Sequence, residues 1–358
     1  MVEGLFFTFG STFEMWAFRI AVIALASFLI GGVVLVTRPQ EEVIGHPKGL
    51  FLLFMAEMWE RFSYYGMRAL LIFYLVQHWL FTDSEASIIY GAYTALVYIT
   101  PVVGGYLADR YIGQRKAVLF GAVLLTLGHF FMAFEGDGGQ ADPVINVFWM
   151  ALALIIVGSG FLKANISVIV GQLYTRTDVR RDPAYTIFYM GINVGAATAS
   201  IICGYLGQTY GWQYGFGLAG FGMLIGLIFF VLGKPLLMGK GEPKDPAKIK
   251  GGKEFAIYGA GIAMVLLCWA AIQYQEMVGY VLGTFGGGLV LYVLFTAVTK
   301  LHPEERDRIF AAMFLILTSI VFWALFEQAG SSLNLFTDRH VDTPVSYTHL
   351  TLPTKRIV

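Results

Sequence analysis

Six charged or phenolic side chains lie within twelve residues of one largely apolar stretch: Glu57, Glu60, Arg61, Tyr64, Tyr65 and Arg68. At about 100° per residue they cover an arc of about 140° of a single helix, and at 1.5 Å per residue the stripe is about 16 Å long. A charge in the middle of a bilayer costs roughly 2.5 to 3.5 kcal/mol. We therefore predict that this stripe lines a deep, water-accessible cavity and does not face lipid.

Carboxylates beside guanidinium groups in such a cavity suit proton coupling, because burial and a neighbouring cation change the proton affinity of a carboxylate in opposite directions. Arginine keeps its charge and only exchanges partners. A substrate carboxylate that competes for Arg61 would free a glutamate to take up a proton. The competing interpretation is a structural ion pair between Glu57 and Arg61, four residues apart. That interpretation leaves Glu60 and Arg68 without a role.

The composition is that of a membrane protein. Of the 358 residues 57% are hydrophobic and 13% are charged, the mean hydropathy is +0.67, and 42 glycines favour closely packed helices. With 24 basic and 24 acidic residues the net charge is zero, which argues against nucleic acid as a partner. The two cysteines, Cys203 and Cys268, lie in apolar stretches and are interpreted as buried free thiols, with no metal site.

Ten stretches are long and apolar enough to cross a bilayer. They are residues 16–36, 50–81, 87–108, 117–134, 145–173, 185–206, 214–233, 255–273, 277–299 and 308–333. The first is interpreted as an uncleaved helix, because Glu3 and Glu14 replace the basic start of a signal peptide. Two charged residues inside later stretches also need an explanation, Lys163 and Glu327.

Basic residues occur in every second connection between these stretches. They are Arg38 and Lys48; Arg110, Arg115 and Lys116; Arg176, Arg180 and Arg181; Lys234, Lys240, Lys244, Lys248, Lys250 and Lys253; and Lys300, Arg306 and Arg308. The intervening connections contain none. By the positive-inside rule the basic connections are predicted to be cytoplasmic. The longest of them, residues 234–253 with Pro243 and Pro246, is predicted to be a linker that follows a six-helix unit.

Two motifs carry a family resemblance. The connection with Gly105, Asp109, Arg110, Gly113 and Arg115 resembles the loop signature of the major facilitator superfamily. The run from Glu57 to Arg68 resembles the first-helix signature of proton-dependent oligopeptide transporters, and the segments 161–165, 188–193 and 322–328 are similar to further segments of that family. The resemblance covers about residues 46–343.

The resemblance implies roles for single residues. Glu57, Glu60, Arg61 and Lys163 would couple protons, Arg61 and Lys163 would bind the peptide carboxylate, and Arg68 and Glu327 would form an outer gate. The implied substrate-binding residues are Arg61, Arg68, Tyr64, Tyr65, Tyr98, Lys163, Asn193, Trp323 and Glu327. No catalytic residue and no cofactor besides protons is expected, and the substrates implied are di- and tripeptides.

The resemblance also implies a domain plan for an all-α, multi-pass protein of the cell membrane. Residues 46–233 would form the amino-terminal six-helix bundle, 234–253 the linker, 254–300 two additional helices and 301–343 the first helix of a second bundle. Residues 1–45 lie outside the family pattern and are interpreted as an extra helix or a misplaced start. Residues 344–358 resemble sequencing-adapter read-through, so we expect a truncated gene model. Ala164 stands at a position where this family usually has proline.

The expected function is proton-coupled symport of di- and tripeptides by alternating access, with membrane lipid as surroundings and a monomer as the full-length state. The alternatives are a carrier of nitrate or another small anion, and a membrane fragment that does not transport. The run Gly215 to Gly220 matches a dinucleotide-binding fingerprint, but it opens a membrane stretch with no preceding strand, so helix packing is the expected reason for its glycines.

Overall fold

Long α-helices make up nearly all of the computed structural model, which describes residues 42–243 and 252–341 and the short stretches 2–3, 8–9, 18–19, 21–22 and 25–26. The long helices are α2 (Lys48–Phe73), α3 (Asp83–Leu107), α4 (Gln114–Met132), α5 (Ile145–Gln172), α6 (Arg181–Tyr210), α7 (Trp212–Leu232), α8 (Lys253–Gln273), α9 (Gln275–Lys300) and α10 (Pro303–Phe326). The all-α fold class predicted from the sequence is confirmed.

The remaining elements are short. The π-helical turns η1 (Tyr74–His78) and η2 (Ala108–Ile112) extend α2 and α3, and η3 (Lys234–Leu237), η5 (Glu327–Gly330) and α11 (Ser332–His340) follow α7 and α10. Two antiparallel hairpins pair β1 (Val2–Glu3) with β2 (Thr8–Phe9) and β3 (Glu42–Val43) with β4 (His46–Pro47). Ile44 and Gly45 between β3 and β4 have φ angles of 52° and 73°, as a two-residue hairpin turn requires.

Most of the helices that match the predicted spans are long and apolar enough to cross a membrane. Eight such segments occur among the described residues, from Asp83–Ile112 to Pro303–Gly330. Helix α2 is not among them, although its 26 residues suffice in length, because it carries the charged stripe. The predicted span 50–81 is helical only to His78, and the predicted span 308–333 ends as an α-helix at Phe326.

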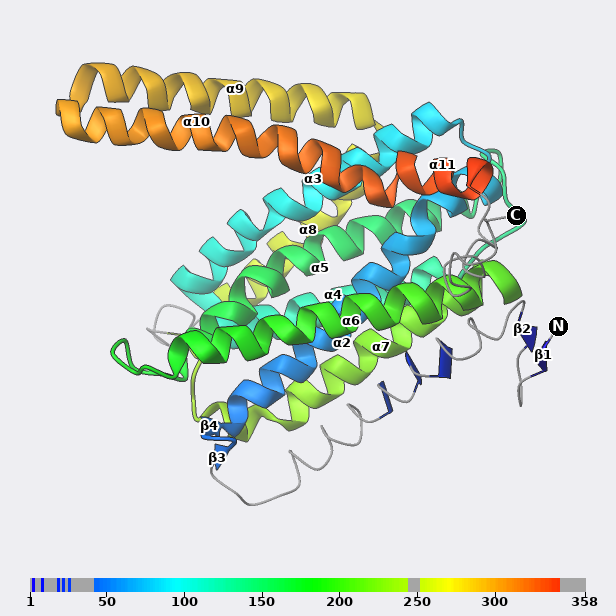
Figure 1. The fold of residues 1–358 in the computed structure, drawn as a ribbon, viewed down its shortest axis with the longest axis horizontal. Helices are drawn as coiled ribbons and strands as arrows, with labels where there is room; N and C mark the ends of the chain where they lie inside the picture. Colours follow the sequence, from blue (N-terminus) through cyan, green and yellow to red (C-terminus); the bar gives the residue numbers. More distant parts are fainter. Residues whose placement is uncertain are drawn as a thin grey trace, which may run out of the picture.

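Helix α2 lies in the middle of the helix bundle (Figure 1). It packs against α6 and α7, α4 packs against α5 and α7, and α5 packs against α3 and α8. The side chains on the apolar face of α2 are buried, and they include Met58, Trp59, Phe62, Met67 and Leu70. This packing fixes the rotation of α2 and therefore the direction of its charged stripe.

Small residues let α2, α6 and α7 approach closely. A Cβ added to Gly66 of α2 would lie 2.7 Å from Cys203 Sγ of α6, and one added to Gly215 of α7 would lie 2.8 Å from the Cys203 backbone oxygen. Gly215 is also the first glycine of the fingerprint-like run, and it lies inside α7. Its close contact with α6 explains that glycine by packing, as the sequence predicted.

Replacing Gly66 with alanine is expected to lower the free energy of unfolding by about 1 to 3 kcal/mol, because the new methyl group overlaps Cys203. Adding Cys203→Ala should recover part of this loss, since it removes the sulfur atom that is struck first. The measurement is thermal unfolding of both single variants and the double variant in detergent. Additive losses would mean that the two residues do not meet in this way.

The basic connections come together at one end of the bundle. Arg180, before α6, donates to Glu42 Oε1 at 3.1 Å and to the Gly45 oxygen at 2.9 Å. His46 Nδ1 lies 2.8 Å from the Tyr174 hydroxyl. The backbone N–H of Arg115 donates to the Gly241 oxygen at 2.8 Å. The α9–α10 connection points to the same side (Figure 1). The predicted segregation of basic loops is therefore present in the fold.

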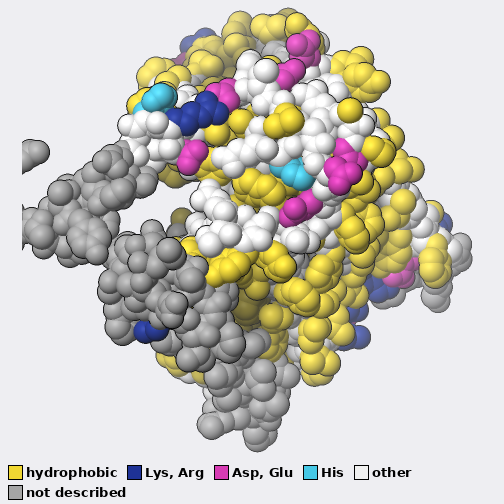
Figure 2. Space-filling view, turned by 90° about the vertical axis from the view of Figure 1, so that its right-hand side faces the viewer, with side chains coloured by type: hydrophobic (Ala, Val, Ile, Leu, Met, Phe, Trp, Pro, Cys, Tyr) yellow, Lys and Arg dark blue, Asp and Glu magenta, His cyan; other side chains and the backbone are white. Residues whose placement is uncertain are grey.

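Acidic loops meet at the opposite end. His78 Nε2 lies 2.7 Å from the Glu135 backbone oxygen, and Glu135 Oε1 accepts from the Gln213 N–H. Asp142 accepts from the backbone N–H groups of Val144, Asp137 and Gly138, and these bonds hold the pKa of its carboxyl below the usual value. Figure 2 shows acidic side chains among other polar residues at this end, with hydrophobic side chains around them.

Helices α9 and α10 extend away from the bundle as a pair (Figure 1). No residue of α10 is buried, and Phe314, Phe322 and Trp323 are exposed. Most of the predicted span 16–36 and of the segment 1–45 lies outside the described residues, as does the predicted tail 344–358. The linker is described only as far as residue 243 and again from residue 252.

Candidate functional site

The charged stripe of α2 turns toward α3, α5 and η5, because the opposite face is held by α6 and α7. The solvent exposure of the stripe differs from the prediction of a water-accessible cavity. The side chains of Glu57, Glu60 and Tyr64 are 2%, 0% and 1% exposed, so this part of the stripe is buried in protein. The side chains of Arg61 and Arg68 are 12% and 11% exposed, and Tyr65 is half-buried. The helical spacing gave the arc correctly, but the arc alone does not show which neighbouring helices cover it.

Glu57, Glu60 and Arg61 form one ionic cluster. Arg61 Nε donates to Glu57 Oε1 at 2.7 Å and lies 3.1 Å from Glu60 Oε2. The structural pair Glu57–Arg61 considered above is thus present, but Glu60 shares the same guanidinium. Glu57 Oε2 and both carboxylate oxygens of Glu60 are buried without a hydrogen bond. Two carboxylates therefore compete for one arginine.

Lys163 of α5 contacts the ring of Tyr64, the next residue of the stripe after Arg61. Its ammonium Nζ is 4.0 Å from the centre of the Tyr64 ring and 5.3 Å from that of Tyr98. Such contacts stabilise a cation without neutralising it. In the described part of the chain, no carboxylate or other acceptor forms a hydrogen bond or an ion pair with this ammonium. Lys163 is a cation held by aromatic rings and left available to an anionic group.

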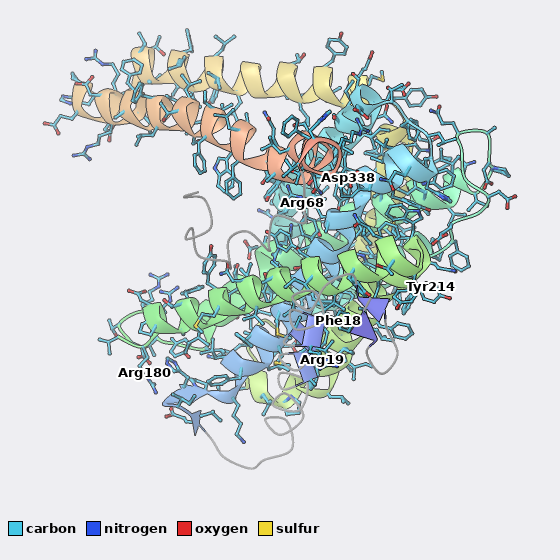
Figure 3. All side chains as sticks on the ribbon, turned by 45° about the vertical axis from the view of Figure 1, so that its right-hand side comes forward. Phe18, Arg19, Arg68, Arg180, Tyr214 and Asp338 are labelled. Atoms are coloured by element: carbon cyan, nitrogen blue, oxygen red, sulfur yellow. The ribbon has the colours of Figure 1, made fainter. Side chains whose placement is uncertain are left out.

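Arg68 and Glu327, predicted as partners from the family resemblance, meet in the structure. Their side chains form an ion pair between α2 and η5, across 259 positions of sequence. Arg68 also donates to the hydroxyl of Tyr90 on α3. A cavity of about 560 Å³ adjoins the pair and is lined in addition by Tyr65, Tyr205 and Asn334. Figure 3 places Arg68 near Asp338 of α11 and far from Arg180, at the end opposite the basic loops.

The other predicted pocket residues lie on exposed surfaces. Tyr98 is 56% exposed and Trp323 is 52% exposed, and the side-chain amide of Asn193 donates to the Tyr189 backbone oxygen at 3.0 Å. Of these three only Tyr98 approaches the cluster, through Lys163. Their use as a peptide pocket stays a prediction.

Two tyrosines of α3 were missed by the sequence analysis. Tyr90 binds Arg68, and Tyr93 is fully buried with a hydroxyl that has no hydrogen-bond partner. Tyr90 and Tyr98 are eight positions apart, which places them on one side of a helix. This spacing of tyrosines in a predicted membrane helix is the sequence pattern that could have pointed to Tyr90.

The loop motif ties the basic end together. Gln114 Nε2 donates to Asp109 Oδ1 at 2.6 Å, and Arg115 Nε donates to Glu242 Oε1 at 2.5 Å. Gly113 has a φ angle of +79°, which favours glycine where the chain turns into α4. Lys116 Nζ lies 2.7 Å from Glu254 of α8. Arg110 is exposed. The motif thus connects the start of α4 to the linker and to α8.

Among the described residues, no group of three His, Cys, Asp or Glu side chains is placed to hold a metal ion. The site consists of three carboxylates, two arginines, a lysine and several tyrosines. Such a set has the chemistry to bind a zwitterion and to exchange protons.

Comparison with known proteins gives consistent matches. The model of the POT family matches residues 115–357. The chain is 37% identical over 319 residues to the uncharacterized transporter YclF of Bacillus subtilis (strain 168), covering 85% of this chain and 62% of that protein. It is 35% identical over 316 residues to the di-/tripeptide transporter of Lactococcus lactis subsp. lactis (strain IL1403), covering 82% and 61%.

A solved structure shares the fold. The crystal structure of a mutant of the peptide transporter POT in complex with alafosfalin superposes with a TM-score of 0.70 at 38% identity, covering 85% of this chain and 63% of that one. The chain thus spans somewhat less than two thirds of the length of the relatives it matches.

Proposed function

The chain belongs to the POT family and is a multi-pass membrane protein, and from this premise we propose that the whole protein carries di- and tripeptides into the cell together with protons. The Lactococcus relative named above is a di-/tripeptide transporter, and the solved relative is a peptide transporter. The observation that carries the proposal for this chain is the buried cluster of Glu57, Glu60 and Arg61 beside the unpaired ammonium of Lys163.

The charges of the cluster account for coupling without covalent chemistry. With both glutamates ionised the cluster carries a net charge of minus one, and one proton makes it neutral. A peptide carboxylate that binds Lys163 and Arg61 draws the guanidinium away from Glu60, which then lacks a cation and takes up the proton. Peptide and proton therefore bind together, and each favours the binding of the other.

The pair Arg68–Glu327 is proposed as the outer gate. It closes the bundle at the end away from the basic loops, and it joins α2 to the segment that follows α10. Opening this end requires both partners to separate and to be solvated. Because the side chains are only 11% and 25% exposed, the pair is shielded from solvent more than an ordinary surface ion pair.

Replacing Arg68 with glutamine or Glu327 with glutamine is expected to lower uptake about tenfold, which corresponds to about 1.4 kcal/mol. The double variant should lose little more, because the second substitution removes a group that is already unpaired. Initial uptake rates of the three variants give the comparison. The exposed pair Asp83–Arg339 at the same end is the matched control, and its loss should change uptake less than twofold.

The proposal is tested by uptake of labelled dialanine into proteoliposomes that contain the whole protein and carry an imposed pH gradient. Accumulation that follows the gradient supports it. Gradient-independent uptake of nitrate with no uptake of dialanine would favour an anion carrier, and the two glutamates beside Arg61 argue against that outcome.

A further inference from the structure

Two cavities adjoin between the start of α3 and the α8–α9 connection, at the end of the molecule with the acidic loops. One has a volume of about 500 Å³ and combines apolar residues with two glutamates and two glutamines in its lining, and the other has a volume of about 420 Å³ and is lined almost entirely by apolar residues. They share Tyr274 and Met277. Because they share these two residues, the two neighbouring cavities are described together as the α3–α9 groove, with the first as its polar part and the second as its apolar part.

The polar part of the α3–α9 groove carries negative charge without compensation. Its charged lining residues are Glu85 and Glu276, and no lysine, arginine or histidine lines it. Glu276 is exposed, and within the described ranges it makes no hydrogen bond or ion pair. Glu85 Oε2 accepts from the N–H and the hydroxyl of Thr82 at 2.9 and 2.8 Å, which leaves Glu85 Oε1 without a donor. This part of the groove favours a cationic hydrogen-bond donor.

The apolar part extends into the membrane. It is lined by aliphatic residues of α3, α8 and α9, among them Leu96, Leu267, Ala271 and Val281. From Tyr274 to Leu267 helix α8 descends about 10 Å, at 1.5 Å per residue. Tyr274 and Tyr280 are 67% and 75% exposed, and tyrosines in this position typically mark the boundary between headgroups and hydrocarbon. The groove therefore presents its acids at headgroup depth and its aliphatic wall at acyl-chain depth.

We propose that the α3–α9 groove binds phosphatidylethanolamine from the outer leaflet, with its ammonium at Glu276 and Glu85 and one acyl chain along α8 and α9. A primary ammonium donates up to three hydrogen bonds to carboxylates, whereas the quaternary ammonium of phosphatidylcholine donates none. An anionic headgroup would be repelled by the two glutamates. The proposal is independent of the transported substrate.

The test is native mass spectrometry of the purified chain in detergent, with phosphatidylethanolamine, its mono- and dimethylated forms, phosphatidylcholine and phosphatidylglycerol of identical acyl chains. Retention is expected to fall with each added methyl group and to be lowest for phosphatidylglycerol. Equal retention of phosphatidylethanolamine and phosphatidylcholine would overturn the proposal, and this comparison needs no variant.

Substitutions locate the site. Glu276→Gln should reduce the preference for phosphatidylethanolamine over phosphatidylcholine about fivefold, and adding Glu85→Gln, which keeps an acceptor for the capping contact with Thr82, should abolish it. Glu304→Gln on α10 removes an equally exposed glutamate outside the groove and should leave the preference unchanged. Ala270→Phe should weaken retention of all these lipids by filling the apolar part. An unchanged preference in the double variant would place the lipid elsewhere.

Discussion

Replacing Glu60 with glutamine in the full-length protein is expected to abolish accumulation of dialanine against its gradient while exchange of labelled for unlabelled dialanine across the membrane continues. The amide has nearly the shape of the carboxylate but does not take up a proton at physiological pH. Glu60 is fully buried, lies 3.1 Å from Arg61 and has no hydrogen-bonded donor, so its loss removes the proton site and leaves the packing in place. Exchange should remain within about threefold of wild type, a change of less than about 1 kcal/mol.

The measurement is the ratio of internal to external peptide at steady state under an inward proton gradient, together with counterflow at equal pH. Glu304→Gln serves as the control, because it removes an exposed carboxylate from α10. Glu57→Gln should have an intermediate effect, since its amide oxygen can still accept from Arg61. A normal accumulation ratio in Glu60→Gln would exclude Glu60 as the coupling residue.

Replacing Lys163 with methionine is expected to weaken binding of dialanine about 10- to 100-fold. A hydrogen bond to a charged group contributes about 1.5 to 3 kcal/mol, and the ammonium of Lys163 is held by the rings of Tyr64 and Tyr98 without an acidic partner of its own. Methionine keeps a long side chain between the two rings and removes the charge.

Calorimetric titration with dialanine and with its carboxyl-terminal amide separates this effect from general damage. Wild type should bind the amide more weakly by the same factor, and the variant should no longer distinguish the two ligands. Lys116→Met, which removes a lysine paired with Glu254 outside the site, is the matched control and should bind dialanine normally. A variant that still prefers the free carboxylate would assign that contact to another residue.

Much of the architecture follows from local patterns in the sequence. Length and hydropathy predict the helices because a backbone in lipid must satisfy its own hydrogen bonds. The alternation of basic connections predicts their common end, where Arg180 meets Glu42 and Arg115 meets the backbone of Gly241. The spacing from Glu57 to Arg68 predicts one charged face, since helical rotation depends on residue number alone.

The burial of the stripe and the pairing of distant residues depend on tertiary packing, which local sequence patterns do not determine. Spacing does not show that α3 and α5 cover Glu57 and Glu60, so the predicted water-lined stripe is buried along its first half. The partner of Arg68 is 259 positions away, and only the family resemblance pointed to it. Tyr90 is an uncharged residue in an apolar stretch, so the sequence does not single it out; its part in the site comes from the hydrogen bond that Arg68 donates to its hydroxyl.

The attachment of α10 to the bundle is one-sided. Arg68–Glu327 and Asp83–Arg339 both lie where α10 gives way to η5 and α11, while the start of α10 stands clear of the bundle beside α9 (Figure 1). Since the two pairs join this end to α2 and α3, breaking them would free α10 to tilt together with α9, against which it packs.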